Sequence, residues 1–423
     1  MLDLRLIRSD PERVKQALAR RGAADGVDEL LALDARRREL LPEIENAQAQ
    51  RKTLSKQIGE AKQRGEEAED LVAEVQGLKE TIESGKAELE KVDADLQRIL
   101  SELPNLPDPD APDGMTEEDA VTLREVGEPP SFDFEPRDHL EIGTALGLIE
   151  MEAAARLSGS RFAYLMGDLV LLELALVRYA MDKLSGEGLE PVIPPVLVRE
   201  QALYGTGFLP DTEQQIYEIP EDDLYLAGTS EVALASLHAD QIFDPGTLPR
   251  RYAGFSSCFR REAGAAGRDT RGIFRVHQFD KVEMFSFVEP GESAAEHERI
   301  LSIEEAILSE LEIPYRVVDI PVGDLGPSAA RKYDCEAWIP SQGRYRELTS
   351  CSNTTDYQAR RLSCRYRSAD GEAAEAVHTL NGTAVAVGRT MIALIENRQD
   401  RDGGFTLPSI LHSYGAPDKI GTR

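Results

Sequence analysis

The segment from Gly254 to Val288 combines cations, carboxylates and an aromatic ring at spacings that suit ligand chemistry. Two stretches of alternating polar and apolar residues flank a loop, Gly264 to Gly267, which is typical of a β-hairpin. Because alternate side chains of a strand share one face, we expect Arg260 and Glu262 to lie together. The same rule groups a second set on the other strand: Arg275, Phe279 and Glu283.

This mixture of residues has two interpretations. It could form a solvent-exposed face with ion pairs between neighbouring strands. Alternatively, guanidinium groups bind phosphate oxygens, an aromatic ring stacks on a base, and carboxylates bind an amine or Mg²⁺. The second interpretation predicts a nucleotide and an amine as ligands.

The segment Phe259 to Glu262 reads FRRE and matches the FRxE signature of motif 2 in class II aminoacyl-tRNA synthetases. The chain resembles the bacterial seryl-tRNA synthetases almost from end to end, with several motifs in the same order. The resemblance implies an α+β protein, in which a long antiparallel α-helical coiled-coil arm precedes a catalytic domain. That class II catalytic domain is expected to be an antiparallel β-sheet flanked by helices. The expected domains are a tRNA-binding arm at 1–103, a proline-rich linker at 104–114 and the catalytic domain at 115–423.

Composition limits the possible partners. A chain of 423 residues is expected to hold two or three domains, and 41% apolar residues suffice for a packed core. The net charge of −29 argues against unspecific attraction to nucleic acid or to anionic membranes. An RNA partner therefore needs a locally basic surface, for which the candidates are Arg250, Arg251, Arg260, Arg261, Arg268, Arg271 and Arg275.

Cysteine usage and the N-terminal sequence point to a reducing compartment. The four cysteines form no CxxC pair, and no histidines cluster, so the sequence predicts neither a zinc site nor a disulfide framework. The N-terminus lacks an apolar signal core, and no later segment is long and apolar enough to span a bilayer. We therefore expect a cytoplasmic protein without membrane contact.

The N-terminal quarter predicts helices. Asp10 and Pro11 form a helix start, and the short helix is expected to reach Gly22. Two heptad-like apolar runs follow, Leu30 to Ala61 and Leu71 to Leu103, and they predict an antiparallel helical hairpin on the order of 50 Å long. Arginines at 37 and 51 interrupt the first run, and Pro42 predicts a bend near residue 41.

The function of this hairpin is open on the pattern alone, because a dimerisation coiled coil has the same periodicity. The resemblance implies that the hairpin grips tRNA instead. Basic residues near its tip could then meet phosphates: Arg51, Lys52, Lys56, Lys62 and Arg64.

Three further segments resemble motifs of the family. A helical pattern from Leu169 to Leu184 precedes Gly188 to Leu197, which resembles motif 1 with its proline at Pro194 or Pro195. It predicts an edge strand, and the resemblance implies a homodimer interface there. The polar segment Arg346 to Asn353 could be a turn after a strand or, as the resemblance implies, part of the ATP site. The segment Asn381 to Thr383 is interpreted as a second turn. The second turn precedes an apolar helix with Arg389, whose charge needs an anion, and resemblance to motif 3 supplies ATP phosphates.

The resemblance also implies the reaction and its residues. Serine is activated by ATP and then transferred to tRNA(Ser), and to tRNA(Sec) as a second substrate. The implied catalytic residues are Arg260, Glu262 and Arg389. The implied ATP-binding residues are Arg260, Arg261, Glu262, Arg275, Val276, Phe279, Glu347, Leu348, Thr349, Ser350 and Arg389, and Glu347 and Ser350 are the implied ligands of Mg²⁺. The implied serine-binding residues are Thr229, Ser230, Glu231, Glu283 and Thr383.

Two rival functions remain at this stage. A ligase that loads an amino acid onto a carrier protein would share the adenylate chemistry, but it would lack the long N-terminal arm. A non-catalytic RNA-binding or coiled-coil protein with a degenerate synthetase fold would have lost some of the charged residues that the motifs retain.

Overall fold

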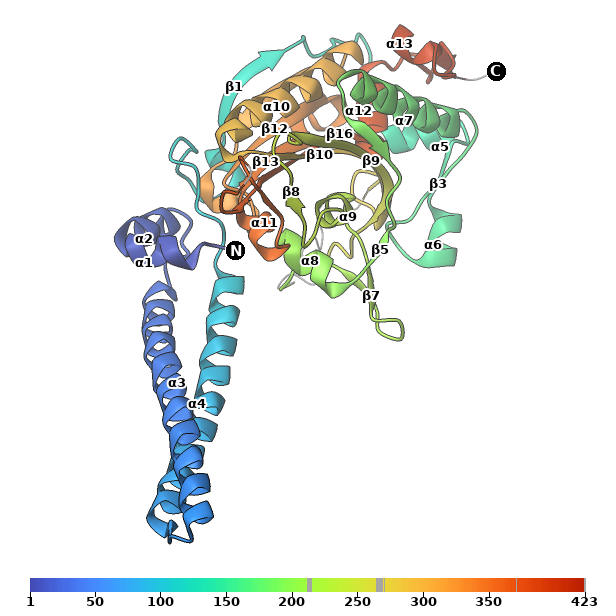
Figure 1. Cartoon of the computed structure of the whole chain (residues 1–423). Coiled ribbons are helices and arrows are strands. Elements are labelled where there is room, and N and C mark those ends of the chain that lie inside the picture. The colour runs from blue at the N-terminus through green and yellow to red at the C-terminus, as the bar shows by residue number, and fades with distance from the viewer. Residues whose placement is uncertain (211–214, 264–268, 270, 370, 422–423) are drawn as a thin grey trace. The chain divides into compact units, whose positions relative to one another are not determined.

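The computed structural model describes residues 1–210, 215–263, 269, 271–369 and 371–421. The chain divides into two compact units, Leu2–Pro104 and Asn105–Arg423, and the second also includes Met1. Figure 1 labels many of the elements of both units. The predicted loop at Gly264 to Gly267 lies outside the described residues, as does the expected basic residue Arg268.

The first unit is entirely helical. It consists of α1 (Leu4–Ser9), α2 (Pro11–Ala19), α3 (Val27–Arg64) and α4 (Glu69–Glu102). The predicted start of α2 is confirmed, because the Asp10 carboxylate accepts a hydrogen bond from the Arg13 N–H at 3.3 Å. The helix ends at Ala19 rather than at Gly22, and α1 was not predicted.

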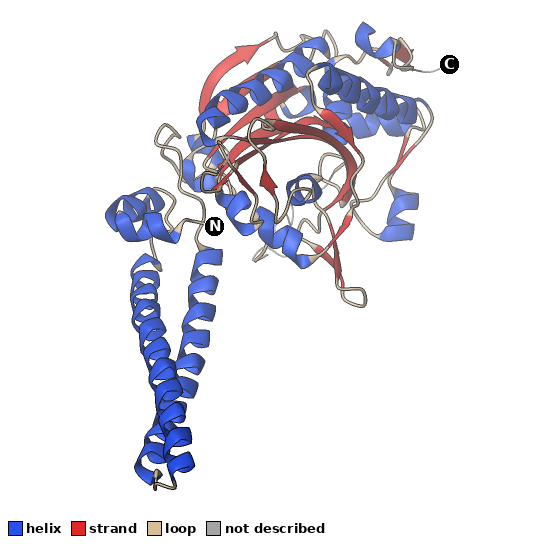
Figure 2. Ribbon diagram, viewed as in Figure 1, coloured by secondary structure: helices blue, strands red, loops and turns tan. Residues whose placement is uncertain are grey.

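The predicted helical hairpin is confirmed by α3 and α4, which contain 38 and 34 residues and lie side by side (Figure 2). At 1.5 Å per residue each helix exceeds about 50 Å. Gly65 ends α3 in a left-handed conformation with φ of 73°, which a glycine adopts without a Cβ clash. The buried seam includes Leu40 and Ile44 of α3 and Val92 and Leu96 of α4.

Salt bridges explain an interruption in the apolar seam. The Arg37 side chain donates to Asp93 on the opposite helix at 2.7 Å, and the neighbouring Arg36 donates to Glu88 at the same distance. The arginine at position 37 therefore joins the two helices through its charge. Helix α3 continues across Pro42, so this proline does not start a new helix.

The second unit is built on a curved eight-stranded sheet. All neighbouring strands are antiparallel except β4 (Glu190–Val192), which pairs in parallel with β9 (Arg250–Phe259). The predicted edge strand is confirmed, although β4 contains Pro191, whereas Pro194 and Pro195 lie beyond its end. The strand order is β1 (Val121–Val126), β11 (Tyr315–Asp319), β12 (Arg331–Ile339), β13 (Arg344–Thr355), β16 (His378–Ala386), β10 (Gln278–Val288), β9 (Arg250–Phe259) and β4 (Glu190–Val192).

Helices cover both faces of this sheet. The long helices α7 (Asp168–Gly186), α10 (Ser293–Glu310) and α12 (Val387–Asn397) cover the convex face, and the first confirms the helix predicted at Leu169 to Leu184. Shorter helices lie on the concave side: α8 (Glu200–Thr206), α9 (Glu231–Ser236) and α11 (Tyr357–Arg361). The smaller elements are α5 (His139–Ala145), α6 (Glu152–Ser158), α13 (Ser409–His412), β2 (Ile149–Glu150), β3 (Tyr164–Leu165), β5 (Leu197–Val198), β6 (Tyr217–Ile219), β7 (Leu224–Leu226), β8 (Ile242–Phe243), β14 (Arg365–Tyr366), β15 (Glu375–Ala376), β17 (Phe405–Thr406) and β18 (Lys419–Ile420).

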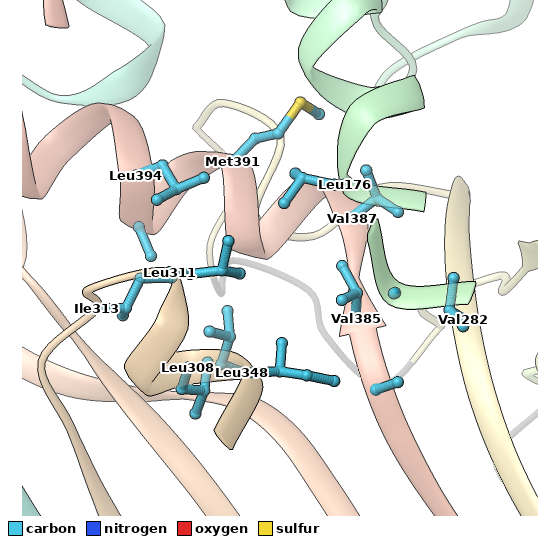
Figure 3. Close-up of a cluster of buried hydrophobic side chains, with 14 of the residues drawn as sticks. Leu176, Val282, Leu308, Leu311, Ile313, Leu348, Val385, Val387, Met391 and Leu394 are labelled. Carbon is cyan, nitrogen blue, oxygen red and sulfur yellow. The ribbon is translucent and has the colours of Figure 1, made fainter. Parts of the chain in front are cut away.

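The main core lies between the convex face of the sheet and its covering helices. Figure 3 shows Leu308 of α10 and Met391 of α12 with the strand residues Val282, Leu348 and Val385. These side chains are almost fully buried. The predicted sheet flanked by helices is therefore confirmed. Among the described residues, no helix is long and apolar enough to cross a membrane.

Two expected turns are strands instead. The segment Arg346 to Asn353 lies within β13, and Asn381 to Thr383 lies within β16. The interpretation as turns was wrong because it relied on the polar character of both segments. Some of the polar side chains are directed to the concave face of the sheet, and Leu348 and Cys351 are in the core on the other face. These strands therefore contain many polar residues, and polarity alone does not distinguish them from turns.

Gly382 gives a direct test of the packing between β16 and α10. A Cβ atom at this position would come within 2.3 Å of Ile300 Cγ2 and 2.8 Å of Glu304 Oε1. We expect Gly382→Ala to destabilise the sheet unit by about 1–3 kcal/mol, because the extra carbon overpacks a rigid core. Urea unfolding followed by fluorescence of the single tryptophan, Trp338 on β12, would measure the loss.

The matched control is Gly291→Ala, because a Cβ atom there would meet no atom within 4 Å. Its unfolding midpoint should stay close to that of the unmodified protein. Equal midpoints for the two variants would contradict the close approach of α10 to β16.

Candidate active site

The predicted hairpin is formed by β9 and β10, with Phe279 opposite Cys258 and Glu283 opposite Gly254. The strands are shorter than expected, since β9 ends at Phe259 and β10 begins at Gln278. Arg260, Glu262 and Arg275 therefore lie beyond the strands, and their predicted placement on strand faces was wrong.

Backbone geometry explains how these residues still meet. The Arg260 N–H donates to the His277 carbonyl at 3.0 Å, and Glu262 then adopts φ of 52°. A positive φ is uncommon for a residue other than glycine and marks a sharp change of chain direction. The turn brings the Glu262 carboxylate to 2.7 Å from Arg275 Nη1.

Arg260 and Phe279 form a part of the site that is both aromatic and cationic. The Arg260 guanidinium carbon lies 5.5 Å from the centroid of the Phe279 ring, and its Nε donates to the Gly228 carbonyl at 3.2 Å. Both side chains line a cleft on the concave face of the sheet. Arg260 is thus held in place while part of its donor set remains available to a ligand.

Lys281 was missed by the sequence reasoning. It lies between Phe279 and Glu283 on one face of β10, lines the cleft, and is only 7% exposed. Its Nζ forms an ion pair with Glu283 Oε2. The strand alternation that grouped Phe279 with Glu283 would also have identified this lysine.

A β-bulge at Leu348 sets the faces of the residues on β13. Thr349 lies opposite Cys335, but Glu347 lies opposite the next residue of β12, Glu336. The extra residue places Glu347 and Ser350 on the same side of the sheet, which strict alternation would not do. The Thr349 hydroxyl is directed the other way and donates to Glu304 Oε2 of α10 at 2.8 Å.

A second bulge, at Ala384 of β16, has a similar effect. Thr383 lies opposite Glu283, whereas Ala386 lies opposite Lys281. The Thr383 hydroxyl is therefore on the concave side, 3.5 Å from Glu283 Oε2.

Arg389, at the start of α12, already has protein partners. Its Nη1 donates to the Glu347 carbonyl at 3.1 Å and lies 3.5 Å from Glu347 Oε2. The Phe274 ring is flanked by two guanidinium carbons, that of Arg389 at 4.8 Å and that of Arg346 at 4.2 Å. The expectation that this arginine needs an external anion for lack of a protein partner was wrong.

The Glu347 carboxylate is held in its ionised form. The side chain is 48% exposed, so desolvation is limited, and the cations of Arg389, Lys332 and Arg260 hold the pKa of Glu347 down to about 2. An ionised carboxylate and the Ser350 hydroxyl on one face provide hard oxygen atoms of the kind that Mg²⁺ prefers.

The segment from Thr229 to Glu231 is buried where α9 begins. The Glu231 N–H donates to Thr229 Oγ1 at 3.2 Å, whereas Ser230 Oγ is buried without a hydrogen-bond partner in the described part of the chain. Gly254 allows this approach to β9, because a Cβ atom there would lie 3.1 Å from Ser230 Oγ. Burial, together with the nearby Glu283 carboxylate, raises the pKa of Glu231 to about 7.

The structure thus brings most of the predicted residues together. Those that line the cleft are Arg260, Glu262, Arg275, Val276, Phe279, Glu347, Leu348, Ser350, Thr383 and Arg389. Arg261 is exposed and does not line it, and the Thr349 hydroxyl faces α10. The other predicted residues that do not line it are Thr229, Ser230, Glu231 and Glu283. Phe274 and Lys281 line the cleft but were not predicted.

Comparison with known proteins identifies the family. Residues 1–107 match the model of the seryl-tRNA synthetase N-terminal domain. Residues 215–398 match the class II core domain of the tRNA synthetases for G, H, P, S and T. A serine–tRNA ligase of Acidothermus cellulolyticus is 51% identical over 421 residues, which cover 99% of each chain. The chain belongs to the seryl-tRNA synthetase family.

Other relatives agree with this assignment. A serine–tRNA ligase of Rubrobacter xylanophilus is 50% identical and covers 100% of this chain and 99% of its own. The crystal structure of seryl-tRNA synthetase from Pyrococcus horikoshii complexed with ATP matches with a TM-score of 0.94 and 41% identity, over 100% of both chains. The expected family, enzyme class and fold are thereby confirmed for this seryl-tRNA synthetase family member.

The ion pair of Lys281 and Glu283 predicts a specific pattern of stability. Lys281→Met leaves an uncompensated buried carboxylate and should cost about 3–5 kcal/mol, and Glu283→Gln should also be costly. The double variant should recover much of the loss because neither charge remains. A double-mutant cycle from urea unfolding, followed by Trp338 fluorescence, would measure the coupling. Additive losses would mean that the two side chains do not form a pair.

Proposed function

We propose that this synthetase attaches L-serine to tRNA(Ser) through a seryl-adenylate intermediate. The observation that carries the proposal is one cleft lined by Arg260, Phe279 and Arg389. Two carboxylates lie beside this lining: Glu283 is paired with Lys281, and Glu231 is close enough to Lys281 and Arg260 to interact with their charges. The first set suits a nucleoside triphosphate, and the second suits an amino acid with an ammonium group and a hydroxyl. Relatives that carry the name serine–tRNA ligase support the choice of substrates.

The proposed ATP site uses positioning and charge stabilisation. Phe279 stacks on the adenine, and Glu262 accepts from its amino group. Arg260 binds the α-phosphate and the serine carboxylate, so that charge developing in the transition state is neutralised. Arg275 and Arg389 bind the outer phosphates. Arg261, Val276, Leu348 and Thr349 complete the proposed set through backbone or peripheral contacts.

Mg²⁺ fits this site through Glu347 and Ser350. Mg²⁺ is commonly held by one or two carboxylates together with substrate phosphates, which agrees with one ionised carboxylate and one hydroxyl on the same face. When bound, the ion would neutralise charge on the phosphates of ATP. Glu347 also orients Arg389, at 3.1 Å through its carbonyl, toward the same region.

The two carboxylates of the proposed serine site have different surroundings and are therefore given different roles. Glu283 is already paired with Lys281, and the Thr383 hydroxyl lies 3.5 Å from its carboxylate. Glu283 and Thr383 are therefore assigned to the serine hydroxyl. Glu231 has no such ion pair among the described residues, and it is assigned with Thr229 to the ammonium group. The buried Ser230 hydroxyl is a further polar group of this site.

The partners proposed for the rest of the molecule follow the family. Residues 1–103 would form the tRNA-binding arm, 104–114 a linker and 115–423 the catalytic domain. Exposed cations near the arm tip, such as Arg51 and Lys56, would meet tRNA phosphates. tRNA(Sec) is proposed as a second tRNA substrate. The proposed assembly is a homodimer that forms through the motif 1 region. The proposed location is a reducing cytoplasm, which agrees with the four buried thiols.

The decisive test is ATP–pyrophosphate exchange with serine, threonine and alanine, run beside charging of total bacterial tRNA. We expect exchange to depend on serine and serine to be incorporated into tRNA, because the proposed serine site pairs an ammonium partner with hydroxyl-binding groups. Exchange with serine but without charging would favour a carrier-protein ligase. Exchange with another amino acid would contradict the roles given to Glu283 and Thr383, and no exchange would favour a non-catalytic RNA-binding protein.

The Mg²⁺ assignment has its own test. Glu347→Gln keeps the size of the side chain but removes the charge, so the Mg²⁺ concentration for half-maximal exchange should rise about tenfold or more. A titration of exchange rate against Mg²⁺ at saturating serine would measure it. The control is Glu292→Gln, an exposed residue at the end of the 3₁₀ helix η2 (Pro290–Glu292). An unchanged Mg²⁺ requirement in the first variant would remove Glu347 from the metal site.

A further inference from the structure

The carboxylate of Glu231 is held by side chains from two other elements. Gln358 of α11 donates through Nε2 to Glu231 Oε1 at 2.8 Å, and Asn381 of β16 donates through Nδ2 to the same oxygen at 3.0 Å. Within the described residues, the other oxygen, Oε2, accepts no hydrogen bond. Two donors therefore fix one oxygen and leave the second for a ligand.

The orientation of the Gln358 amide is determined by its surroundings. Its Nε2 also donates to the Thr206 carbonyl at 3.2 Å, and a carbonyl can only accept. On the other side, the Thr379 hydroxyl donates to Gln358 Oε1 at 2.9 Å. A flipped amide would place its oxygen against the Thr206 carbonyl and the Glu231 carboxylate, so the donor must face Glu231.

Burial makes this arrangement rigid. Gln358 and Thr379 are fully buried, and Thr354 extends the network by a hydroxyl contact of 2.6 Å to Thr379 Oγ1. A buried polar network whose members are satisfied specifies one geometry, since any rearrangement leaves an unpaired polar group. The position of the Glu231 carboxylate is therefore set from α11 and β16 as well as from its own helix.

We propose that Gln358, together with Asn381, is a positioning residue that orients Glu231 so that its Oε2 receives the ammonium group of the amino acid. This inference rests on the proposed function. Gln358 touches no substrate in this arrangement, and it acts only through the carboxylate. Loss of its donor should weaken amino-acid binding and leave ATP binding unchanged.

The ionisation of Glu231 supplies a second readout. The groups that face its carboxylate are Glu283 and Lys281 of β10, Arg260 after β9, and the amides of Gln358 and Asn381. Burial and Glu283 raise the pKa of Glu231, whereas the Gln358 hydrogen bond, Lys281 and Arg260 lower it. Removing the Gln358 donor should raise this pKa further, so that the charged form appears only at higher pH.

The experiment compares the full-length protein with Gln358→Met, which is similar in size and cannot donate. In serine-dependent ATP–pyrophosphate exchange, we expect the KM for serine to rise about tenfold or more and the KM for ATP to stay unchanged. The acidic limb of kcat/KM for serine should move up by about one pH unit. The matched control is Gln399→Met, which removes another buried amide, one bonded to Arg137 and Glu396.

A second variant keeps the inference testable if Gln358→Met does not fold. Thr379→Val is nearly isosteric and removes the hydroxyl that fixes Gln358 Oε1, so it should shift the pH profile in the same direction by a smaller amount. An unchanged serine KM and pH profile in a folded Gln358 or Thr379 variant would overturn the positioning role. A lack of serine exchange in the unmodified enzyme would instead overturn the proposed function.

Discussion

The antiparallel register of β9, β10, β16 and β13 is the constraint on which the site depends. Each pair of opposing residues shares a face, so the register decides which side chains reach the concave cleft. Single extra residues at Leu348 and Ala384 shift that pattern. Without the first bulge, Glu347 and Ser350 would lie on opposite faces of the sheet and could not serve one ligand.

Charge compensation is the second constraint. The carboxylates on the concave side would repel one another, and each is stabilised by different neighbours. Glu283 is paired with Lys281, Glu347 is stabilised by surrounding cations, and Glu231 is bound by two amides. On the convex side, burial raises the pKa of Glu304 well above its usual value, so this carboxyl favours its neutral form.

Strand register and charge compensation both depend on pairing between elements. For this reason the sequence identified the site residues more easily than it predicted their arrangement. The FRRE signature was enough to identify Arg260 and Glu262, and strand alternation was enough to group Phe279 with Glu283. The bulges at Leu348 and Ala384 leave no clear local signal, because each is defined by pairing with another strand, the preceding β12 for Leu348 and the distant β10 for Ala384. Asn381 was interpreted as part of a turn, and its bond to Glu231, 150 positions away, could not be read from local pattern.

The helical arm was easier to predict for a related physical reason. Its seam comes from contacts between neighbouring runs in the sequence, and the 3–4 spacing repeats over 38 and 34 residues in α3 and α4. Even Arg37, which broke the apolar pattern, meets a partner on the adjacent helix at 2.7 Å. The sheet has no such repetition, because strands far apart in the chain become neighbours and each position faces a different environment.

That contrast bears on catalysis. Adenylate formation needs no protein nucleophile, so the site has to hold two substrates and neutralise charge at fixed places. Buried strands and satisfied hydrogen bonds supply such rigidity, whereas a flexible surface would have to reorganise around each substrate. The distant residues that set the register and orient the carboxylates therefore contribute to the reaction by limiting where charge can lie.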